Sequence, residues 1–472
     1  MKELEKKGSR MLILYGKRRV GKTSLIKKLF DDSESKKLYF FVPKNERING
    51  VISSYAAIAK TALNLKEYER IESFSDLIKL LLEYSKQEKI IVAFDEFQNF
   101  SYIYPEAIDI LQREWDMRDE SSNLSLVASG SVMGMIKDIF MNKNAPLFKR
   151  AYNMIEIKEL GIEKAFALMS VLGIESFEDR LRLYFLFGGV IFYYSLIDYY
   201  DVHSFGEAVE RLLLSPVASL KDTVKNDMIE AFGNGSATYF SILEGIALGK
   251  NTNNEIAAYA QLKETSLSQY IYDLRSMIGV IDVITIPTKE FKSGSKKNKF
   301  VITDNFYRFW FAAVNRNYSY YEINDMTGLS AKLNEALSIF NGDAFERFAI
   351  RFIEFLSTNG SLFHIDSIGA WWGRDQSKTR DKNREEIDIV AINKKLKYIL
   401  FAECKWTNEP VGTHLYEELK RKSALVEWNN KGRKERFALF SKSGFTDSMK
   451  EIAKKEQVLL FDLKAIENAM MS

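Results

Sequence analysis

Short apolar runs and amphipathic segments alternate along the first third of the chain. Apolar residues fill most positions of MLILY, IIVAF and LSLVA, and runs of about four to eight such residues are typical of strands buried on both faces. Apolar residues instead recur at helical spacing from about Ile48 to Leu65 and from Phe74 to Ser85. Further strands are expected at KLYFFV, which begins at Lys37, and at YNMIEI, which begins at Tyr152. Strands that alternate with helices predict an α/β domain with a parallel sheet.

The middle third is helical and rich in aromatic residues from Gly161 to about Asn226. From about Tyr239, three helical segments are followed by two short strands, VIDVITIP and KNKFVITD, around a lysine-rich loop. Helix-turn-helix followed by a basic hairpin is the arrangement of a winged helix.

Such a module predicts contact with DNA. The residues on the helix that would enter a groove are Ser266, Ser268, Gln269 and Tyr272. The lysines that could neutralise phosphates are Lys289, Lys292, Lys296, Lys297 and Lys299. The alternative is a winged helix that packs within the protein, with its lysines merely solvated.

The last third carries charged residues inside strands that are otherwise apolar. EEIDIVAI and YILFAECKW predict a hairpin, preceded by an amphipathic helix, NGDAFERFAIRFIEFL, that bears Glu346. Period-two alternation puts Glu403 and Lys405 on one face of the second strand, and Asp388 lies within the first. Charged groups in buried strands are costly unless they are paired or liganded. The alternatives are therefore a metal site and a structural ion pair.

A metal site would use these side chains. Asp388 and Glu403 could bind one or two Mg²⁺ ions that activate water, and Glu346 could complete the metal shell. Lys405 could orient or acidify the water. Basic residues nearby could hold a phosphate backbone whether or not the site cleaves it, and these are Arg374, Lys378, Arg380, Lys382 and Arg384.

The segment GKRRVGKT, Gly16 to Thr23, joins the strand MLILY to a helix that includes SLIKKLF. It matches the phosphate-binding pattern G-x-x-x-x-G-K-[ST] in sequence and in context. Gly16 and Gly21 let the backbone turn tightly near an anion, and a helix N-terminus favours negative charge. Lys22 supplies a charge for the β- and γ-phosphates of ATP, and the Thr23 hydroxyl can ligate Mg²⁺. The residues expected to bind the nucleotide are Gly16, Lys17, Arg18, Arg19, Val20, Gly21, Lys22, Thr23 and Ser24.

Polar residues end the strands that follow. IIVAF runs into Asp95, which could hold Mg²⁺ through water, and Glu96, which is placed to orient or deprotonate the attacking water. Ser129, near the end of LSLVASGS, could contact the γ-phosphate or that water, or could form a plain strand-to-loop turn. Arg150, in APLFKR, could reach a γ-phosphate or could form a surface charge pair.

Composition adds a few limits. The net charge of +3 is near neutral, so a nucleic-acid surface must come from local basic clusters. A single cysteine, Cys404, excludes an internal disulfide and fits a reducing cytoplasm, and three scattered histidines give no zinc spacing. The charged residues 1–10 are no secretory signal, and the most apolar stretch, from Leu183, is too interrupted to span a membrane. A cytoplasmic protein without a membrane segment is expected.

GKRRVGKT, FDEFQ, ASGS, PLFKR and FGGV together resemble the archaeal-type ATPases, a branch of the AAA+ and STAND-like P-loop proteins. The resemblance covers most of the chain. It implies an ATPase core at 1–160, a helical lid beside the ATP site at 161–230 and a winged helix at 231–325. A homo-oligomer that forms through the ATPase domain is a further expectation. Members usually open with an Arg- and Glu-bearing segment near the nucleotide base, whereas only fifteen residues, with MKELEKK, precede Gly16 here. No base contact is therefore assigned, and the start is a candidate truncation.

Glu403 follows Asp388 by fifteen positions, and Lys405 lies two positions after Glu403. This pattern on a hairpin resembles the PD-(D/E)XK nuclease superfamily, with Ile387 in place of the proline. The C-terminal domain of archaeal-type ATPases looks like this too, which implies a restriction-endonuclease-like α/β domain at 326–472. The expected protein binds and hydrolyses ATP, acts on DNA and uses ATP and Mg²⁺ as cofactors. The alternative is an ATP-driven signalling switch whose C-terminal domain binds nucleic acid or protein without cleavage.

Overall fold

The structure is a computed structural model, and the residues it describes are 6–66, 70–289, 298–379 and 383–471. The chain divides into two compact units. Unit 1 holds Met1–Glu159 with the segment Tyr272–Gly279, and unit 2 holds Leu160–Ile271 with Val280–Ser472. Among the helices in the described ranges, none is long and apolar enough to cross a membrane.

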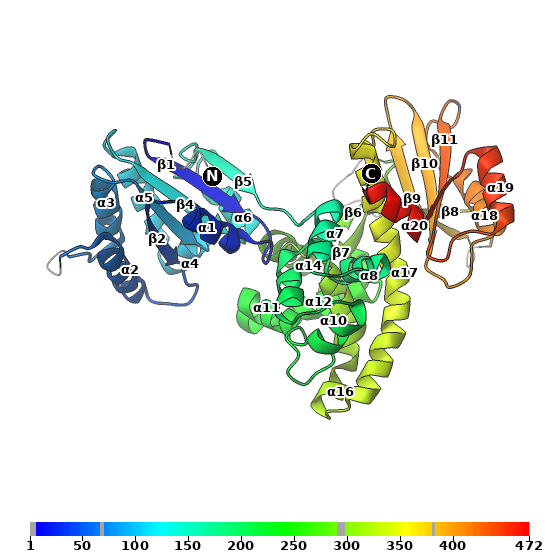
Figure 1. The fold of residues 1–472 in the computed structure, drawn as a ribbon, viewed down its shortest axis with the longest axis horizontal. Helices are drawn as coiled ribbons and strands as arrows, with labels where there is room; N and C mark the ends of the chain where they lie inside the picture. Colours follow the sequence, from blue (N-terminus) through cyan, green and yellow to red (C-terminus); the bar gives the residue numbers. More distant parts are fainter. Residues whose placement is uncertain (1–5, 67–69, 290–297, 380–382, 472) are drawn as a thin grey trace. The chain divides into compact units, whose positions relative to one another are not determined.

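Unit 1 is built on a five-stranded parallel sheet with the strand order β2-β3-β4-β1-β5 (Figure 1). Its strands are β1 (Arg10–Tyr15), β2 (Lys36–Phe41), β3 (Ile90–Asp95), β4 (Leu124–Gly130) and β5 (Asn153–Glu156). Its helices are α1 (Lys22–Asp31), α2 (Ile48–Leu63), α3 (Phe74–Tyr84), α4 (Phe100–Ile103), α5 (Glu106–Asp116) and α6 (Met133–Phe140). Strands β3 and β4 are buried along their whole length, which explains their nearly continuous apolar sequences. The predicted α/β fold with a parallel sheet is confirmed.

Helices cover both faces of this sheet. On one face, side chains of α2, α3, α5 and α6 pack against alternate strand residues such as Phe40 and Phe94. On the other face, Ile26 of α1 packs against the intervening residues, which include Leu14 and Ile91. Because β3, β4 and β1 are neighbours and parallel, the loops that follow them meet at one edge of the sheet.

Unit 2 begins with helices and continues with a small hairpin. The first helices are α7 (Ile162–Val171), α8 (Phe177–Phe187), α9 (Ile191–Tyr199), α10 (Phe205–Leu212) and α11 (Thr223–Phe232). They are followed by α12 (Ser236–Ala247), α13 (Asn253–Tyr259), α14 (Glu264–Asp273), β6 (Ile281–Ile284) and β7 (Lys299–Ile302). Thr252 and Glu255 form a capping box at the start of α13, as TNNE suggests, and β6 pairs with β7 in antiparallel fashion.

The last part of unit 2 is a mixed sheet with the strand order β12-β11-β10-β9-β8. Its strands are β8 (Ser367–Arg374), β9 (Arg384–Asn393), β10 (Tyr398–Lys405), β11 (Lys434–Ser441) and β12 (Leu459–Asp462). The sheet is preceded by helices α15 (Asn305–Phe309), α16 (Tyr318–Glu322) and α17 (Met326–Thr358). One helix follows each of the last three strands: α18 (Thr413–Ser423) after β10, α19 (Asp447–Glu456) after β11 and α20 (Leu463–Met471) after β12. Strands β8, β9 and β10 are antiparallel, whereas β10, β11 and β12 are parallel. The aromatic residues Phe352 of α17 and Phe440 of β11 are in contact, which joins this long helix to the sheet.

Candidate functional site

The loop between β1 and α1 has the sharp turns that its glycines allow. Gly16 and Gly21 have φ values of 155° and 97°. A Cβ at Gly16 would lie 2.1 Å from the carbonyl oxygen of Ile157, so the loop passes too close to that backbone for any other residue. Gly21 is the N-cap of α1, and among the described residues no side chain caps this helix and no acidic residue lies in its first turn. The first amides of α1 are therefore suited to bind an anion.

The side chain of Lys22 is only 5% exposed and folds over the same loop. Its Nζ donates to the carbonyl oxygens of Gly16, at 3.0 Å, and Lys17, at 2.8 Å. Burial lowers the pKa of Lys22, and the nearby carboxylates of Glu96 and Asp95 act in the opposite direction. The loop thus holds an ammonium group in a desolvated position, where its attraction for phosphate is less screened by water.

Asp95, the last residue of β3, connects side chains from three other elements. Its Oδ2 accepts hydrogen bonds from Thr23 Oγ1 and from the Tyr39 hydroxyl, both at 2.7 Å, and its Oδ1 accepts one from Ser129 Oγ. The structure therefore brings Thr23 and Ser129 to one carboxylate. Tyr39 was missed from the sequence; its signal is its place on β2, where the register pairs it with Ala93, two residues before Asp95. Burial and the Asp95 carboxylate raise the pKa of Tyr39.

Glu96 has a φ of 58°, in the left-handed region. This conformation costs a residue with a Cβ on the order of 1 kcal/mol and is found preferentially at functional sites. Oε2 of Glu96 accepts hydrogen bonds from Ser131 Oγ, at 2.7 Å, and from Gln98 Nε2. Gln98 and Ser131 are both buried, and both were missed from the sequence, although FDEFQ places Gln98 two residues after Glu96. These contacts fix the direction of a carboxylate at the strand edge.

Arg150 lies at the opposite end of the sheet. The amide of Tyr152 donates to the carbonyl oxygen of Met11 at the start of β1, whereas the P-loop follows the end of β1. The Arg150 guanidinium pairs with Asp116, with 2.6 Å between Nη2 and Oδ2. Since Arg150 precedes a strand parallel to β1, it cannot reach a phosphate on the P-loop of its own chain. Within this chain the structure shows the charge pair that the sequence left as the alternative, and a γ-phosphate contact of Arg150 stays a prediction only for a neighbouring copy.

The other residues expected to bind the nucleotide surround these groups. Lys17 pairs with Glu159 at 3.1 Å. Arg18 and Arg19 are half-buried, Val20 is buried and Ser24 is exposed. The donor set fits a nucleotide with Mg²⁺, because it combines an uncapped helix start, a buried ammonium and a hydroxyl bonded to a carboxylate.

In the C-terminal sheet, Asp388 and Glu403 meet across β9 and β10. The register pairs Ile389 with Ala402, so the next positions along the ladder set Asp388 opposite Glu403. The amide of Cys404 donates to Asp388 Oδ2 at 2.8 Å. Burial, and then the Asp388 carboxylate, raise the pKa of Glu403 to about 7. Two carboxyl groups that crowd each other in this way favour retention of a proton at one of them.

Helix α17 brings Glu346 into the same electrostatic environment. Burial and the Asp388 carboxylate raise the pKa of Glu346 to about 8, and the Lys405 ammonium acts in the opposite direction. Lys405 is exposed at the end of β10. The structure thus gathers Glu346, Asp388, Glu403 and Lys405 in one region of the C-terminal sheet.

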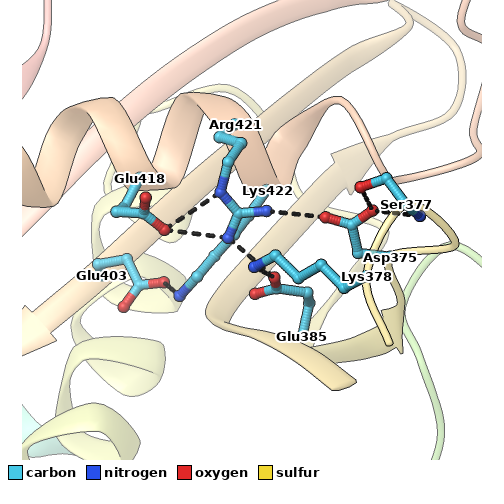
Figure 2. Close-up of polar contacts among 8 residues, drawn as sticks. All are labelled: Asp375, Ser377, Lys378, Glu385, Glu403, Glu418, Arg421 and Lys422. Atoms are coloured by element: carbon cyan, nitrogen blue, oxygen red, sulfur yellow. Dashed lines mark hydrogen bonds and ion pairs between the residues drawn. The ribbon is translucent and has the colours of Figure 1, made fainter. Parts of the chain in front are cut away.

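Lys422, which was missed from the sequence, pairs with Glu403 from α18, with 2.8 Å between Nζ and Oε1 (Figure 2). Helix α18 follows β10 after a short connection, which allows its side chains to reach the strand. Arg421, the residue before Lys422, forms ion pairs with the carboxylates of Asp375, Glu385 and Glu418 (Figure 2). A partly buried network of charges therefore lies next to the Asp388–Glu403 pair.

Within the described residues, no group of three or more His, Cys, Asp or Glu side chains is arranged to hold a metal ion. The Asp388 carboxylate nevertheless acts on Glu346, and the expected place of Glu346 in a metal shell stays a prediction. The Asp388–Glu403 pair has suitable donor chemistry, since Mg²⁺ is commonly held by one or two carboxylates together with waters and substrate phosphates.

The residues expected to contact DNA divide into three groups, and Lys289 belongs to the exposed one. Lys299 pairs with Glu386 at 3.1 Å and lies 4.2 Å from the ring centre of Trp372, and Lys378 pairs with Glu385 at 2.6 Å. These two lysines are thus engaged within the protein. Exposed residues are Ser266, Ser268, Gln269, Tyr272, Arg374 and Arg384. Lys292, Lys296, Lys297, Arg380 and Lys382 lie outside the described residues.

Two family models match parts of the chain. Residues 1–190 match an ATPase domain found predominantly in Archaea. Residues 310–424 match a family described as archaeal and bacterial proteins of unknown function. The first match, together with the parallel sheet and the loop after β1, shows that the N-terminal part of the chain is a P-loop ATPase domain.

Two individual proteins are similar over most of their lengths. An uncharacterized protein of Methanocaldococcus jannaschii is 28% identical in an alignment of 446 positions that covers 90% of this chain and 89% of that protein. The solved structure of a Walker-type ATPase of Pyrococcus abyssi has a TM-score of 0.51 and 18% identity, and the match covers 64% of this chain and 90% of the other. At that identity the second similarity shows the fold alone.

Proposed function

Because residues 1–190 form a P-loop ATPase domain, we propose that the protein binds and hydrolyses ATP with Mg²⁺ and acts on DNA through unit 2, whose C-terminal sheet carries a nuclease site. The observation that carries the first part is the hydrogen bond from Thr23 Oγ1 to Asp95 Oδ2. It joins the hydroxyl of the P-loop to the carboxylate of the neighbouring strand, and this pairing is what Mg²⁺ binding beside a nucleotide requires.

Each group of the ATPase site has a distinct role in this proposal. The first amides of α1 and the Lys22 ammonium bind phosphate oxygens, and Thr23 and Asp95 hold Mg²⁺. ATP with Mg²⁺ supplies the γ-phosphoryl group that is transferred to water. Glu96 orients that water and accepts its proton, and the hydrogen bonds from Ser131 and Gln98 keep the Glu96 carboxylate in place. Ser129 positions Asp95.

The nuclease proposal rests on the facing pair Asp388 and Glu403. Burial and then the Asp388 carboxylate raise the pKa of Glu403, and a divalent cation would offset both effects. Mg²⁺ would supply water activation and charge stabilisation when bound. Asp388 and Glu403 would hold the ion. Lys405, exposed at the end of β10, would orient the water, and Lys422 keeps the Glu403 carboxylate in a defined rotamer.

The arrangement of elements supports the domain assignments. The order α17, β8, β9, β10, α18 and β11 supports a restriction-endonuclease-like domain at 326–472, and α12 to α14 with the β6–β7 hairpin support a winged helix at 231–325. The helices from α7 to α11 correspond to the lid at 161–230. A cytoplasmic location fits the single buried Cys404, and assembly through the ATPase domain is part of the proposal.

A second candidate function is an ATP-driven regulatory switch whose C-terminal domain binds without cleavage. Two observations favour it: Lys422 already neutralises Glu403, and Lys299 is packed on Trp372. Both make the region resemble a structural ion-pair cluster.

Nuclease assays separate the two functions. Purified full-length protein is incubated with plasmid DNA, single-stranded DNA and RNA, in Mg²⁺ or Mn²⁺, with and without ATP. Cleavage that Asp388→Asn abolishes, while ATP hydrolysis persists, supports the nuclease. Absence of cleavage of every substrate, with ATP hydrolysis intact, supports the switch and contradicts the nuclease.

A further inference from the structure

A cavity of about 780 Å³ lies within unit 2, and none of its lining residues belongs to the two sites described above. Its walls come from the end of α12, strand β7, the segment Trp310–Val314 with the residues after it, and the middle of α17. The volume falls within the range of about 300–1,000 Å³ that small-molecule sites occupy. Its lining includes apolar surface from Phe340 and from Ile339, a large aliphatic side chain that is 77% exposed.

Two arginines in this cavity share a single carboxylate. Arg308 Nη2 pairs with Asp343 Oδ2, and Arg347 Nε lies 3.5 Å from the same oxygen. Arg347 also donates from Nη1 to the carbonyl oxygen of Ile302 at 3.3 Å, which fixes its position against β7. Asp343 is thus the one carboxylate among the described residues that pairs directly with both guanidinium groups, and the Asp304 carboxylate also acts on Arg308.

Arg308 is the more unusual of the two because it is buried. Its side chain is only 8% exposed, and Nη1 has no hydrogen-bond partner among the described residues. Its guanidinium lies 5.2 Å from the ring centre of Phe340, so aromatic packing holds it in place. Burial, and then Arg347, lower the pKa of Arg308 to about 10, which still leaves it protonated at neutral pH. A buried, positioned and unsatisfied donor of this kind is explained by a ligand that the protein receives.

The charge of the lining indicates what kind of ligand fits. The cations are Arg308, Arg316, Lys332 and Arg347, and the carboxylates are Glu335 and Asp343. Lys332 and Glu335 neutralise each other at 3.0 Å, so the surplus lies with the three arginines. A surplus of two positive charges matches a phosphate monoester, which carries nearly two negative charges at neutral pH. A planar guanidinium fork also binds phosphate in bidentate fashion.

We propose that this cavity is a binding site for a small phosphorylated organic molecule, whose phosphate monoester is held by Arg308 and Arg347 and whose apolar body lies against Phe340 and Ile339. The site is separate from the P-loop, since all of its residues belong to unit 2. It requires neither ATP hydrolysis nor nuclease activity.

Calorimetric titration of the full-length protein tests the proposal, with ADP and Mg²⁺ in excess so that the P-loop is occupied. The probes are phenyl phosphate, inorganic phosphate, benzoate and a short single-stranded DNA. Phenyl phosphate should bind with a millimolar or lower dissociation constant, more tightly than inorganic phosphate, and benzoate should bind far more weakly. Arg347→Gln should weaken phenyl phosphate at least about tenfold, the loss expected for a charge-assisted hydrogen bond.

Arg308→Gln should weaken phenyl phosphate binding to the same extent. If Arg308→Gln does not fold, because Arg308 is buried, Arg347→Gln alone still tests the proposal. The matched control is Arg351→Gln, one turn further along α17, whose partner is Glu354 rather than the cavity. Phenyl phosphate binding that is absent, or unchanged in Arg347→Gln, overturns the proposal. Equal binding of benzoate would make the site a carboxylate site, and binding of DNA alone would make it a nucleic-acid contact; either result also overturns it.

Discussion

Asp388 faces Glu403 across antiparallel strands β9 and β10, and the amide of Cys404 holds one Asp388 oxygen at 2.8 Å. Glu403 is buried and Asp388 is half-buried, so two ionised carboxylates here repel each other more strongly than they would in water. Burial and Asp388 together raise the pKa of Glu403 to about 7. A binding partner with positive charge would therefore be favoured at this position, and Lys422 supplies part of that charge.

The first prediction concerns metal binding by this pair. Asp388→Asn and Glu403→Gln should each abolish binding of Mn²⁺ and cleavage together, because each removes a ligand charge. Lys405→Ala should keep Mn²⁺ binding but lower cleavage by about 100-fold or more, since the water is no longer oriented. Calorimetric titration and DNA cleavage report the two effects. The control is Glu451→Gln, which replaces an exposed residue of α19. Normal Mn²⁺ binding by Asp388→Asn would contradict the assignment of Asp388 as a metal ligand.

The second prediction concerns pH. The pKa of Glu346 is raised to about 8, so the folded protein holds a proton that the unfolded chain releases near its ordinary pKa of 4.5. Its contribution to stability is therefore largest below about pH 4.5 and is lost as the pH rises through about 8. In EDTA, the urea midpoint of the wild type should fall between about pH 5 and pH 8, and Glu346→Gln should flatten that fall.

Tryptophan fluorescence can follow this unfolding, because four of the six tryptophans lie in the last third of the chain, namely Trp371, Trp372, Trp406 and Trp428. Glu354→Gln, on the same helix, should retain the wild-type slope. An unchanged slope in Glu346→Gln would mean that Glu346 does not retain its proton in the folded state.

The third prediction concerns the ion pair between Lys422 and Glu403. Lys422→Met should destabilise the protein by about 1–3 kcal/mol, because it leaves a buried carboxyl without its charged partner. In the Glu403→Gln background the same change should cost much less, since no charge remains to be compensated. Urea unfolding of the four proteins measures this difference. Equal losses in both backgrounds would show that the two residues act independently.

The fourth prediction concerns Arg150. Its guanidinium is engaged by Asp116 at the amino end of the sheet, so Arg150→Ala should leave the ATPase rate of the monomer within about twofold of wild type. Stability should fall by no more than about 1 kcal/mol, as is usual for an exposed ion pair. A large loss of ATPase activity at dilute protein would contradict this placement. A loss confined to high protein concentration would instead assign Arg150 to a neighbouring copy.

The sequence predicted those features in which one local pattern determines one structure. The apolar runs before Gly16 and through Phe94 predicted buried strands, and the fixed glycines of the P-loop specify its turns. The hairpin with Asp388 and Glu403 was predicted from two strand-like segments that are apolar apart from a few charged residues.

Contacts between residues that are far apart in the sequence could not be predicted from it. Tyr39 and Lys422 reach their carboxylates from other strands or helices, and no spacing rule identifies such partners. The position of Arg150 was missed because a motif shows proximity in sequence but not which end of a parallel strand it precedes. Lys299 was expected to face DNA, but it contacts Trp372 and Glu386, which lie on strands β8 and β9 more than 70 positions further along the chain.

The central claim is that the N-terminal domain hydrolyses ATP with Glu96 as the group that receives the proton from water. The measurement is phosphate release from ATP by full-length wild type and Glu96→Gln, with nucleotide affinity determined in parallel, and with Lys28→Ala on the exposed side of α1 as the control. Glu96→Gln should bind ATP with wild-type affinity and hydrolyse it at least about 100-fold more slowly, while Lys22→Ala should lose binding. Wild-type turnover by Glu96→Gln would contradict the account.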